Sequence, residues 1–191
     1  HRLSHMRVVE DMAWPRVSAR GSGSCQASWR AVESLDQPRC PKRAEAMRRA
    51  LGLVEAELSD ISLTLDRLSL WHSTAVPGSA IRRQGWAFAK GGEERYSLDN
   101  ATLNQRLLDL VSGSPLERSL RAYLDILFFH PFLDGNSRMA RLAFHHFACL
   151  DGLDFTGVDS LFRLSIPAGN RKAYRLFSEL AQSCLTEPGP N

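Results

Sequence analysis

One segment of the chain combines the side chains that phosphate chemistry needs. It reads His130-Pro-Phe-Leu-Asp-Gly-Asn-Ser-Arg-Met-Ala-Arg141, so an imidazole, a carboxylate, a Gly-Asn turn and two guanidinium groups fall within one loop and the start of a helix. Imidazoles accept protons at neutral pH, carboxylates hold divalent ions, and backbone amides and arginines bind phosphate oxygens. The segment therefore predicts a site that handles a nucleotide phosphate.

His130 and Asp134 are expected to have the acid–base and metal-binding roles. A hydroxyl that attacks phosphorus must lose its proton, and an imidazole with an ordinary pKa of ~6.5 can accept it as a general base. Asp134 offers the oxygen ligand that Mg²⁺ takes beside substrate phosphates. The structural alternatives are a histidine that caps a helix end and an ordinary turn aspartate before Gly135.

The residues that follow are expected to bind the phosphates. Gly135 and Asn136 tolerate positive φ, and such a turn exposes backbone N–H groups as an anion nest, to which the Asn136 amide adds a donor. Arg138 and Arg141 are three positions apart and share one helix face, where guanidinium forks suit a polyphosphate. Without a ligand, the same residues would form a simple loop-to-helix turn and a surface arginine pair.

The segment resembles the signature of the Fic family, His-x-Phe-x-(Asp/Glu)-Gly-Asn-(Gly/Lys)-Arg-x-x-Arg. Every fixed position matches except Ser137, where the family usually has Gly or Lys. A glycine lets the backbone approach the phosphates without a Cβ, whereas serine is small, caps helix N-termini and can donate its hydroxyl. A retuned site, a different nucleotide or leaving-group preference, and weak activity are the three interpretations of this departure. Phe132, the apolar residue of the loop, is expected to anchor the loop in the core.

The resemblance implies an activity. Fic proteins of this kind transfer AMP from ATP, with Mg²⁺, to a Ser, Thr or Tyr hydroxyl of a target protein and release pyrophosphate. His130 is then the base, Asp134 the metal ligand, and Gly135, Asn136, Ser137, Arg138 and Arg141 the phosphate-binding residues. Other Fic-type proteins transfer UMP, phosphate or phosphocholine, or remove AMP, and a non-catalytic nucleotide-binding module is a further alternative.

Apolar periodicity and turn residues predict the elements that carry this site. Helices are expected at about 41–59, 61–73, 99–110, 115–129, 137–150, 159–164 and 167–185. Residues 81–96 alternate aromatic and polar side chains around a Gly-Gly pair and predict a β-hairpin. The expected fold is all-α, a Fic-type helical bundle with one hairpin, and in the family this hairpin is a flap that binds the target protein. Here Trp86, Ala87 and Phe88 would form the docking strand.

Composition sets the limits of the prediction. With 43% hydrophobic and 24% charged residues the chain is typical of a globular protein, and no apolar run approaches the ~20 residues that span a bilayer. A net charge of +3, without a basic run interleaved with aromatics, does not favour nucleic-acid binding.

The four cysteines lack Cys-x-x-Cys spacing and are interpreted as reduced thiols rather than zinc ligands. Lys42, Arg43, Arg48 and Arg49 are interpreted as the solvated face of a helix.

Domain limits and regulation complete the predictions. Residues 1–40 contain the turn-like segment Ala19-Arg-Gly-Ser-Gly-Ser-Cys25 and end at Pro38, and they are expected to be an irregular extension or linker, with 41–187 the Fic domain and 188–191 a tail. Ser183 and Glu187 partly resemble the inhibitory Ser/Thr-x-x-x-Glu-Gly/Asn helix of the family, whose Glu pairs with the second motif arginine. An antitoxin-like partner is the alternative inhibitor. Many arginines stand against only three lysines, Lys42, Lys90 and Lys172, which favours a GC-rich bacterial gene. The expected location is the bacterial cytoplasm, or a host cell if the protein is a delivered effector.

Overall fold

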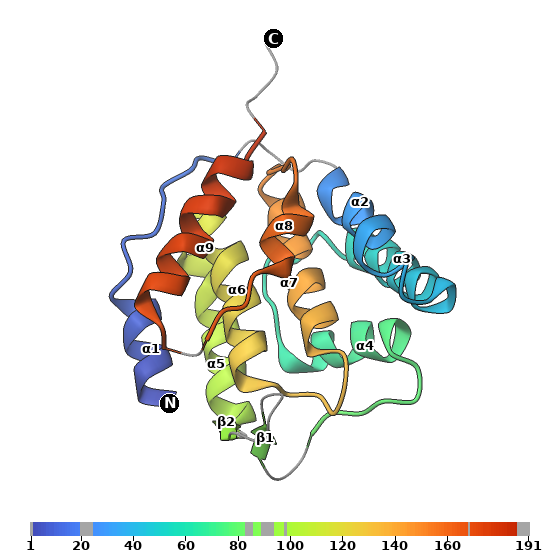
Figure 1. Ribbon diagram of the computed structural model, residues 1–191, viewed down its shortest axis with the longest axis horizontal. Helices are drawn as coiled ribbons and strands as arrows, with labels where there is room; N and C mark the ends of the chain where they lie inside the picture. The colour runs from blue at the N-terminus through green and yellow to red at the C-terminus, as the bar shows by residue number, and fades with distance from the viewer. Residues whose placement is uncertain are drawn as a thin grey trace.

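The computed structural model describes residues 2–19, 25–82, 86–88, 94–97, 99–167 and 169–186. Over these residues the chain is a bundle of α-helices with a two-stranded antiparallel sheet (Figure 1), and the predicted all-α fold class is confirmed. The elements in chain order are α1 (Arg2–Glu10), α2 (Gln26–Leu35), α3 (Pro41–Ala56), α4 (Leu65–Ala75), β1 (Trp86–Phe88), β2 (Glu94–Ser97), α5 (Asn100–Asp109), the 3₁₀ turn η1 (Leu110–Ser112), α6 (Pro115–Phe129), α7 (Asn136–Leu150), α8 (Val158–Arg163) and α9 (Arg171–Cys184).

Helices α6 and α7 form the centre of the bundle and pack against each other (Figure 1). Helix α6 begins at a capping box in which Ser114 and Glu117 satisfy each other's backbone donors, with Pro115 in the first turn. Both central helices are buried over most of their length. Helices α2, α3 and α4 lie on one side of this pair and α1, α5 and α9 on the other (Figure 1), and the loop between α6 and α7 leaves Leu133 and Asp134 exposed.

The irregular conformation expected for residues 1–40 is wrong for α1 and α2. In α2, the buried apolar residues Ala27, Ala31 and Leu35 recur every four positions and pack into the same hydrophobic core as α7. The turn-forming residues before α2 and the prolines after it concealed this period, because they predicted a loop across the whole segment.

Helix α1 packs Val8 and Val9 into the core and is also held by a buried polar network. The His5 ring stacks on Phe128 and lies 2.8 Å from an Asp125 oxygen through Nε2 and 2.5 Å from the Tyr174 hydroxyl through Nδ1. Asp125 also accepts two hydrogen bonds from Arg106, each of 3.0 Å. These partners come from α5, α6 and α9, and no sequence period in α1 could have indicated them.

Strands β1 and β2 confirm the predicted hairpin. Ala87 pairs with Tyr96 and Trp86 with Ser97 in antiparallel register, with an irregularity between Ala87 and Phe88. The Gly-Gly turn lies outside the described residues. At the base of the hairpin, the Asn100 side-chain amide donates to the Arg82 carbonyl oxygen (3.3 Å). This bond joins the residue before the hairpin segment to the start of α5.

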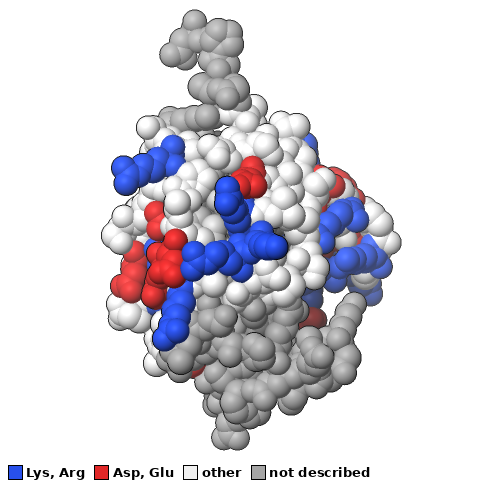
Figure 2. Space-filling model, turned by 60° about the vertical axis from the view of Figure 1, so that its left-hand side comes forward, with Lys and Arg blue, Asp and Glu red and all other residues white. Residues whose placement is uncertain are grey.

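The surface carries both signs of charge. Exposed ion pairs such as Arg171–Asp11 (2.9 Å) and Arg175–Glu179 (2.8 Å) join opposite charges, and basic and acidic groups lie beside one another on the face seen in Figure 2. In the described part of the chain, no helix combines the length and the apolar character needed to cross a membrane.

Candidate active site

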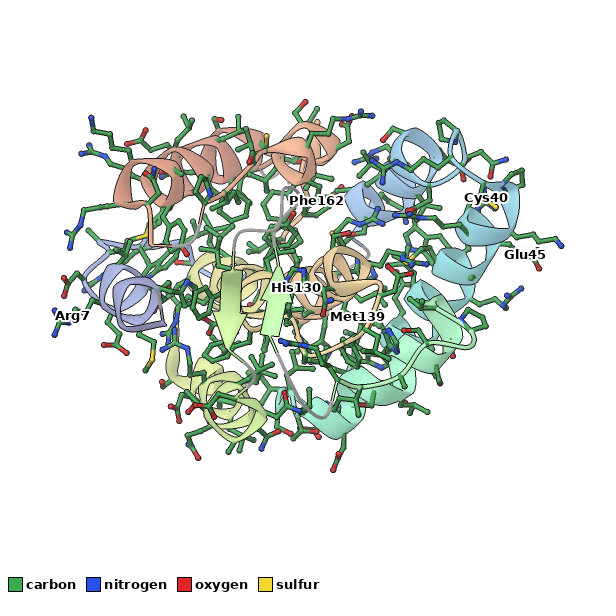
Figure 3. The ribbon with its side chains drawn as sticks, turned by 60° about the horizontal axis from the view of Figure 1, so that its bottom comes forward. Arg7, Cys40, Glu45, His130, Met139 and Phe162 are labelled. Carbon is green, nitrogen blue, oxygen red and sulfur yellow. The ribbon has the colours of Figure 1, made fainter. Side chains whose placement is uncertain are left out.

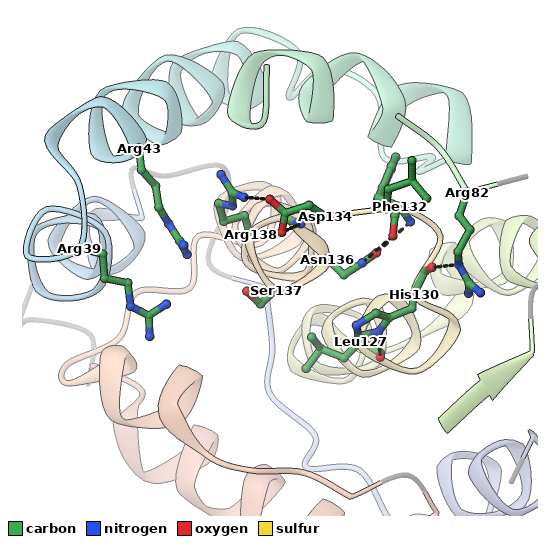
Figure 4. A pocket seen from close by; sticks show the side chains of 12 residues that line it. Arg39, Arg43, Arg82, Leu127, His130, Phe132, Asp134, Asn136, Ser137 and Arg138 are labelled. Atoms are coloured by element: carbon green, nitrogen blue, oxygen red, sulfur yellow. Dashed lines mark hydrogen bonds and ion pairs between the residues drawn. The ribbon is translucent and has the colours of Figure 1, made fainter. Parts of the chain in front are cut away.

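Six of the predicted site residues line one pocket of about 510 Å³ at the α6–α7 loop (Figure 4). They are His130, Asp134, Gly135, Asn136, Ser137 and Arg138. Seen from the end that carries the hairpin, His130 lies near the middle of the molecule (Figure 3). The structure therefore brings the general base, the carboxylate and the phosphate-binding turn of the prediction together.

His130 ends helix α6 in the left-handed conformation, with φ 48° and ψ 56°. It is the single non-glycine residue with positive φ among the residues described. Its Nδ1 lies 2.6 Å from the Leu127 carbonyl oxygen, and because a carbonyl only accepts, Nδ1 must carry the ring proton. The neutral ring then has its unprotonated nitrogen at Nε2, which is the form that a general base requires.

The backbone around His130 is fixed by the segment that precedes the hairpin. Arg82 is 5% exposed, and its guanidinium donates to the Phe129 and His130 carbonyl oxygens, each at 2.9 Å. Its own N–H donates to the Pro131 oxygen at 2.6 Å. Arginine satisfies the last carbonyls of a helix well, so Arg82 caps α6 and holds the loop from the side.

Phe132 anchors the loop in the core, as predicted. It is 1% exposed and stacks on the His72 ring with centroids 4.0 Å apart. His72 Nε2 lies 2.8 Å from the Asp134 carbonyl oxygen, so this nitrogen is the donor. Burial lowers the pKa of His72, which keeps the ring neutral beside the loop.

Gly135 is required twice over. Its φ of 83° lies in the left-handed region, and a Cβ at this position would lie far inside van der Waals contact with Cγ2 of Val76. The turn leads directly into α7, whose first intrahelical bond runs from Met139 N–H to the Gly135 oxygen (2.9 Å). The backbone amides of Asn136, Ser137 and Arg138 are therefore the first-turn donors of α7 at the pocket.

The Asn136 side chain holds the loop together at the pocket, and its predicted contact with a ligand stays a prediction. Its Nδ2 donates to the Phe132 carbonyl oxygen at 2.9 Å, and its Oδ1 accepts from the Phe132 N–H at 3.0 Å. The side chain is 5% exposed. These two bonds close the loop on itself, and the backbone amide of Asn136 is one of the first-turn donors of α7.

Asp134 and Arg138 form an ion pair at the edge of the pocket. Arg138 Nη2 lies 2.8 Å from Asp134 Oδ2, and its Nη1 donates to the Ala75 carbonyl oxygen at 3.1 Å. The Asp134 side chain is 73% exposed, and its Oδ1 accepts the Gly135 N–H. One exposed carboxylate beside a set of amide donors fits the habit of Mg²⁺, which takes one or two carboxylates and completes its shell with phosphate and water oxygens.

Arg141 lies apart from the other predicted residues. Its Nη2 donates to Asp36 Oδ1 at 3.0 Å, and Nη1 lies 2.8 Å from Oδ2, with both residues buried. It lines a neighbouring pocket of about 190 Å³, which shares Ser137, Arg39 and Arg43 with the first. Burial acts to raise the pKa of Asp36, but the hydrogen bonds and charges of Arg141 and Arg43 outweigh it and lower the pKa.

Residues 63–148 match the model of the Fic/DOC family, and this stretch contains the whole segment from His130 to Arg141. Over these residues the chain belongs to the Fic/DOC family. No curated protein matches the chain.

Solved structures share the fold of this Fic domain at low sequence identity. IbpAFic2 covalently tethered to Cdc42 aligns with a TM-score of 0.56 and 15% identity, covering 94% of this chain and 70% of that one. A histidine-to-alanine variant of IbpAFic2 in complex with adenylylated Cdc42 aligns with a TM-score of 0.54 and 14% identity, covering 95% of this chain and 69% of that one. IbpAFic2 alone aligns with a TM-score of 0.51 and 13% identity, covering 95% of this chain and 70% of that one. At these identities the likeness establishes the fold.

Two arginines of the Fic pocket were missed as site residues. Arg39 and Arg43, from the start of α3 and the turn before it, line both pockets (Figure 4). Arg43 was interpreted as part of a solvated helix face, but its Nε donates to the buried Asp36 at 2.7 Å. Only the packing of α3 against α7 directs it to the site, so the local charge pattern could not have identified it.

The remaining predicted residues lie at the margins of the structure. Trp86, Ala87 and Phe88 form β1, and their side chains lie outside the described part of the chain. Ser183 is exposed in the last turn of α9, where its hydroxyl donates to the Leu180 oxygen. Glu187 lies beyond the described residues, so its inhibitory role stays a prediction.

Proposed function

We propose that this protein is a Fic-type protein adenylyltransferase, which transfers AMP from ATP to a Ser, Thr or Tyr hydroxyl of a target protein. The observation that carries the proposal is the position of His130. Its Nδ1 lies against the Leu127 carbonyl oxygen, which leaves Nε2 as the acceptor of the neutral ring, and the residue lines the same pocket as the first turn of α7. A proton acceptor and a phosphate-binding helix N-terminus are the two parts that this transfer needs.

The residues divide the transfer step among themselves. The target hydroxyl gives its proton to His130 Nε2 as its oxygen bonds to the α-phosphorus, and the bond from that phosphorus to the pyrophosphate oxygen breaks. The first-turn amides of α7 stabilise the charge that grows on the phosphate oxygens. Arg138, with Arg39 and Arg43 nearby, offsets the charge of the polyphosphate. As in other phosphoryl chemistry, positioning and charge stabilisation supply most of the rate.

Asp134 is the residue that would hold Mg²⁺. Its exposed carboxylate lies on the pocket and is shared with Arg138, so the side chain is already oriented toward the phosphate-binding turn. When bound, the ion would neutralise phosphate charge and orient the polyphosphate.

A target protein is the proposed acceptor, bound through the hairpin. The IbpAFic2 structures, which contain adenylylated or tethered Cdc42, make a protein acceptor the natural hypothesis for a chain of this fold. The base of the hairpin is joined to the site, because Arg82 bonds the His130 backbone and its own carbonyl accepts from Asn100. An extended target segment that pairs with β1 would be delivered beside His130.

Ser137 favours a second candidate, a Fic-type transferase with another donor or reaction. Its side chain is exposed and lines both pockets, so it would contact the polyphosphate or its leaving group directly. UMP, phosphate or phosphocholine transfer, or AMP removal, remain the reactions to compare with AMP transfer. A nucleotide-binding module without turnover is disfavoured by the intact His130 and Asp134.

The test is labelling of protein by nucleotides. The full chain is incubated with Mg²⁺ and each α-labelled nucleoside triphosphate, alone and with bacterial or eukaryotic lysate, beside His130→Ala. Label from ATP that is retained on protein and absent in the variant supports adenylyl transfer, and a mass increase of one AMP on a hydroxyl residue identifies the acceptor. Label from another nucleotide alone establishes the second candidate. Tight nucleotide binding without label from any donor would exclude nucleotidyl transfer and leave phosphate or phosphocholine transfer, AMP removal and the binding module.

Inhibition through Glu187 or an antitoxin-like partner also stays a proposal. The Arg141 guanidinium is already engaged by Asp36. Glu187 would therefore have to share Arg141 with Asp36 or displace it, and removing residues 183–191 would raise transfer activity if it does.

A further inference from the structure

A second group of reactive side chains lies away from the Fic pocket, on the buried side of α7. Cys25, His145 and Cys149 each place one ligand atom within 4.8 Å of the others, and all three are buried. Glu55 reaches the group from α3, with Oε1 3.1 Å from His145 Nε2. The transfer mechanism uses none of these residues.

The spacing of the donor atoms fits one tetrahedral metal ion. A thiolate at ~2.3 Å and an imidazole nitrogen at ~2.0 Å from the same zinc ion lie about 3.5 Å apart. Cys149 Sγ and His145 Nε2 are 3.5 Å apart. A carboxylate oxygen and an imidazole nitrogen on one zinc lie about 3.3 Å apart by the same geometry, close to the separation of Glu55 and His145.

Both thiols lie in the hydrophobic core beside the polar ring of His145. Cys25 is the N-cap residue of α2, yet its side chain makes no capping hydrogen bond and is turned into the core. Cys25 and Cys149 are free cysteines and do not form a disulfide. The carboxylate is oriented from the far side, because the Trp29 indole N–H donates to Glu55 Oε1 at 2.7 Å, the kind of outer contact that positions metal ligands.

We propose that Cys25, His145, Cys149 and Glu55 bind one Zn²⁺ ion. Two thiolates, an imidazole and a carboxylate complete a tetrahedral shell and leave no position for substrate, so the ion has a structural role. Both thiols release their protons on binding. The Glu55 side chain is 32% exposed, which gives the ion a route from the surface to three otherwise buried ligands.

The site joins three helices at one point. Cys25 precedes α2, Glu55 belongs to α3, and His145 and Cys149 belong to α7, so the ion cross-links the N-terminal helices to the helix that carries the phosphate-binding turn. The opposite end of α2 carries Asp36, which holds Arg141. Helix α2 is therefore attached to α7 at both ends, by the Asp36–Arg141 pair at one end and by the metal at the other. This attachment does not depend on which reaction the pocket performs.

Metal content and cobalt spectroscopy test the proposal on the full chain. The protein is purified with a phosphine reductant, its zinc content is measured by elemental analysis after gel filtration, and the metal-free protein is titrated with Co²⁺. One zinc per chain is expected, with thiolate-to-cobalt charge-transfer absorption and the intense visible bands of tetrahedral cobalt. Chelation is expected to lower the thermal midpoint, because a metal that binds only the folded state stabilises it.

Four variants decide which residues bind the ion. Cys25→Ser and Cys149→Ser should each lose bound zinc and the charge-transfer band, and Glu55→Gln should keep the band with weakened affinity. Cys40→Ser is the matched control, because Cys40 is an exposed free cysteine at the edge of the molecule (Figure 3), and it should retain one zinc per chain. Circular dichroism confirms that each variant is folded.

Three results would overturn the proposal. They are zinc-free protein that gives no cobalt spectrum, full zinc binding in both Cys25→Ser and Cys149→Ser, and a Cys25–Cys149 disulfide in the reduced preparation. Each reading is independent of transfer activity, so failure of the adenylyl transfer proposal does not affect it.

Discussion

The carboxylate of Asp36 holds the guanidinium of Arg141 at two points, with separations of 3.0 and 2.8 Å, although the residues are 105 positions apart in the chain. Both side chains are buried. The second motif arginine therefore does not lie open on the phosphate pocket but is tied to the end of α2. The pair connects a helix outside the matched family region to the helix that carries the motif.

We expect Asp36→Ala to destabilise the protein by about 3–5 kcal/mol, because removing one member of a buried ion pair leaves the other charge unpaired. Urea denaturation of the variant and the wild type measures the difference. Asp11→Ala is the matched control, since Asp11 forms an exposed pair with Arg171 and exposed pairs contribute about 1 kcal/mol or less. An equal loss of unfolding free energy in both variants would mean that the buried pair stabilises the protein no more than an exposed pair does.

The same pair predicts a dependence of stability on pH. The pKa of Asp36 is lower in the folded protein than its ordinary value, so its contribution is complete above the unfolded pKa of about 3.9 and is lost as pH falls through the folded pKa. The free energy of unfolding should therefore fall below about pH 4. In Asp36→Asn this acid slope should be shallower, and an unchanged slope would assign the acid sensitivity to other carboxylates.

Replacing His130 separates its chemistry from its backbone conformation. Both His130→Ala and His130→Asn should reduce transfer by about 10²–10⁴-fold, the range for removal of a general base. They should differ in stability, because φ at this position is 48° and Asn tolerates left-handed backbone better than Ala. Thermal melts should give His130→Asn a free energy of unfolding about 1 kcal/mol higher than that of His130→Ala. Transfer activity retained by either variant would exclude His130 as the base.

Gly135→Ala should cost about 1–3 kcal/mol and lower nucleotide affinity, because the new Cβ meets Val76 and the backbone has positive φ. Gly157→Ala is the control for the backbone term alone, since φ there is 72° and a Cβ meets nothing within 4 Å. Adding Val76→Ala to Gly135→Ala should recover part of the loss. Calorimetric binding of a non-hydrolysable nucleotide and urea denaturation measure the two effects.

Ser137→Gly tests the residue at which the motif departs from the family pattern. Ser137 is exposed in the first turn of α7, so the change should alter stability by less than about 1 kcal/mol. If its Cβ restrains the polyphosphate, kcat/KM for ATP should rise and the ranking among nucleotides should change. Competition among nucleotides measured side by side checks this, and an unchanged ranking would show that Ser137 does not set donor preference.

The central helices and the hairpin could be predicted from the sequence because their signals are local. The capping box at Ser114, the stop at Asp151 and the glycine before α7 mark the two core helices to within one residue. The convergence of His130, Asp134 and the Gly135 turn was also local, since one loop carries all three. Local spacing was sufficient wherever the relevant residues are neighbours in the chain.

The sequence could not predict contacts that depend on tertiary packing. The period of Ala27, Ala31 and Leu35 was present, but the surrounding turn residues outweighed it. Nothing near Arg141 indicates Asp36. The cysteine spacing argued against zinc because such arguments consider short separations, whereas the fold brings Cys25 beside Cys149.

The double attachment of α2 to α7 has a practical consequence for anyone who expresses this protein in pieces. A fragment trimmed to residues 63–148 would delete Cys25, Asp36 and Glu55 while keeping Arg141 and His145, whose charged or polar groups would then face an open hydrophobic surface. Such a fragment should be insoluble or misfolded although it contains the whole signature. The limits of sequence similarity and the limits of the folding unit are different boundaries here, and a usable fragment must begin before Cys25.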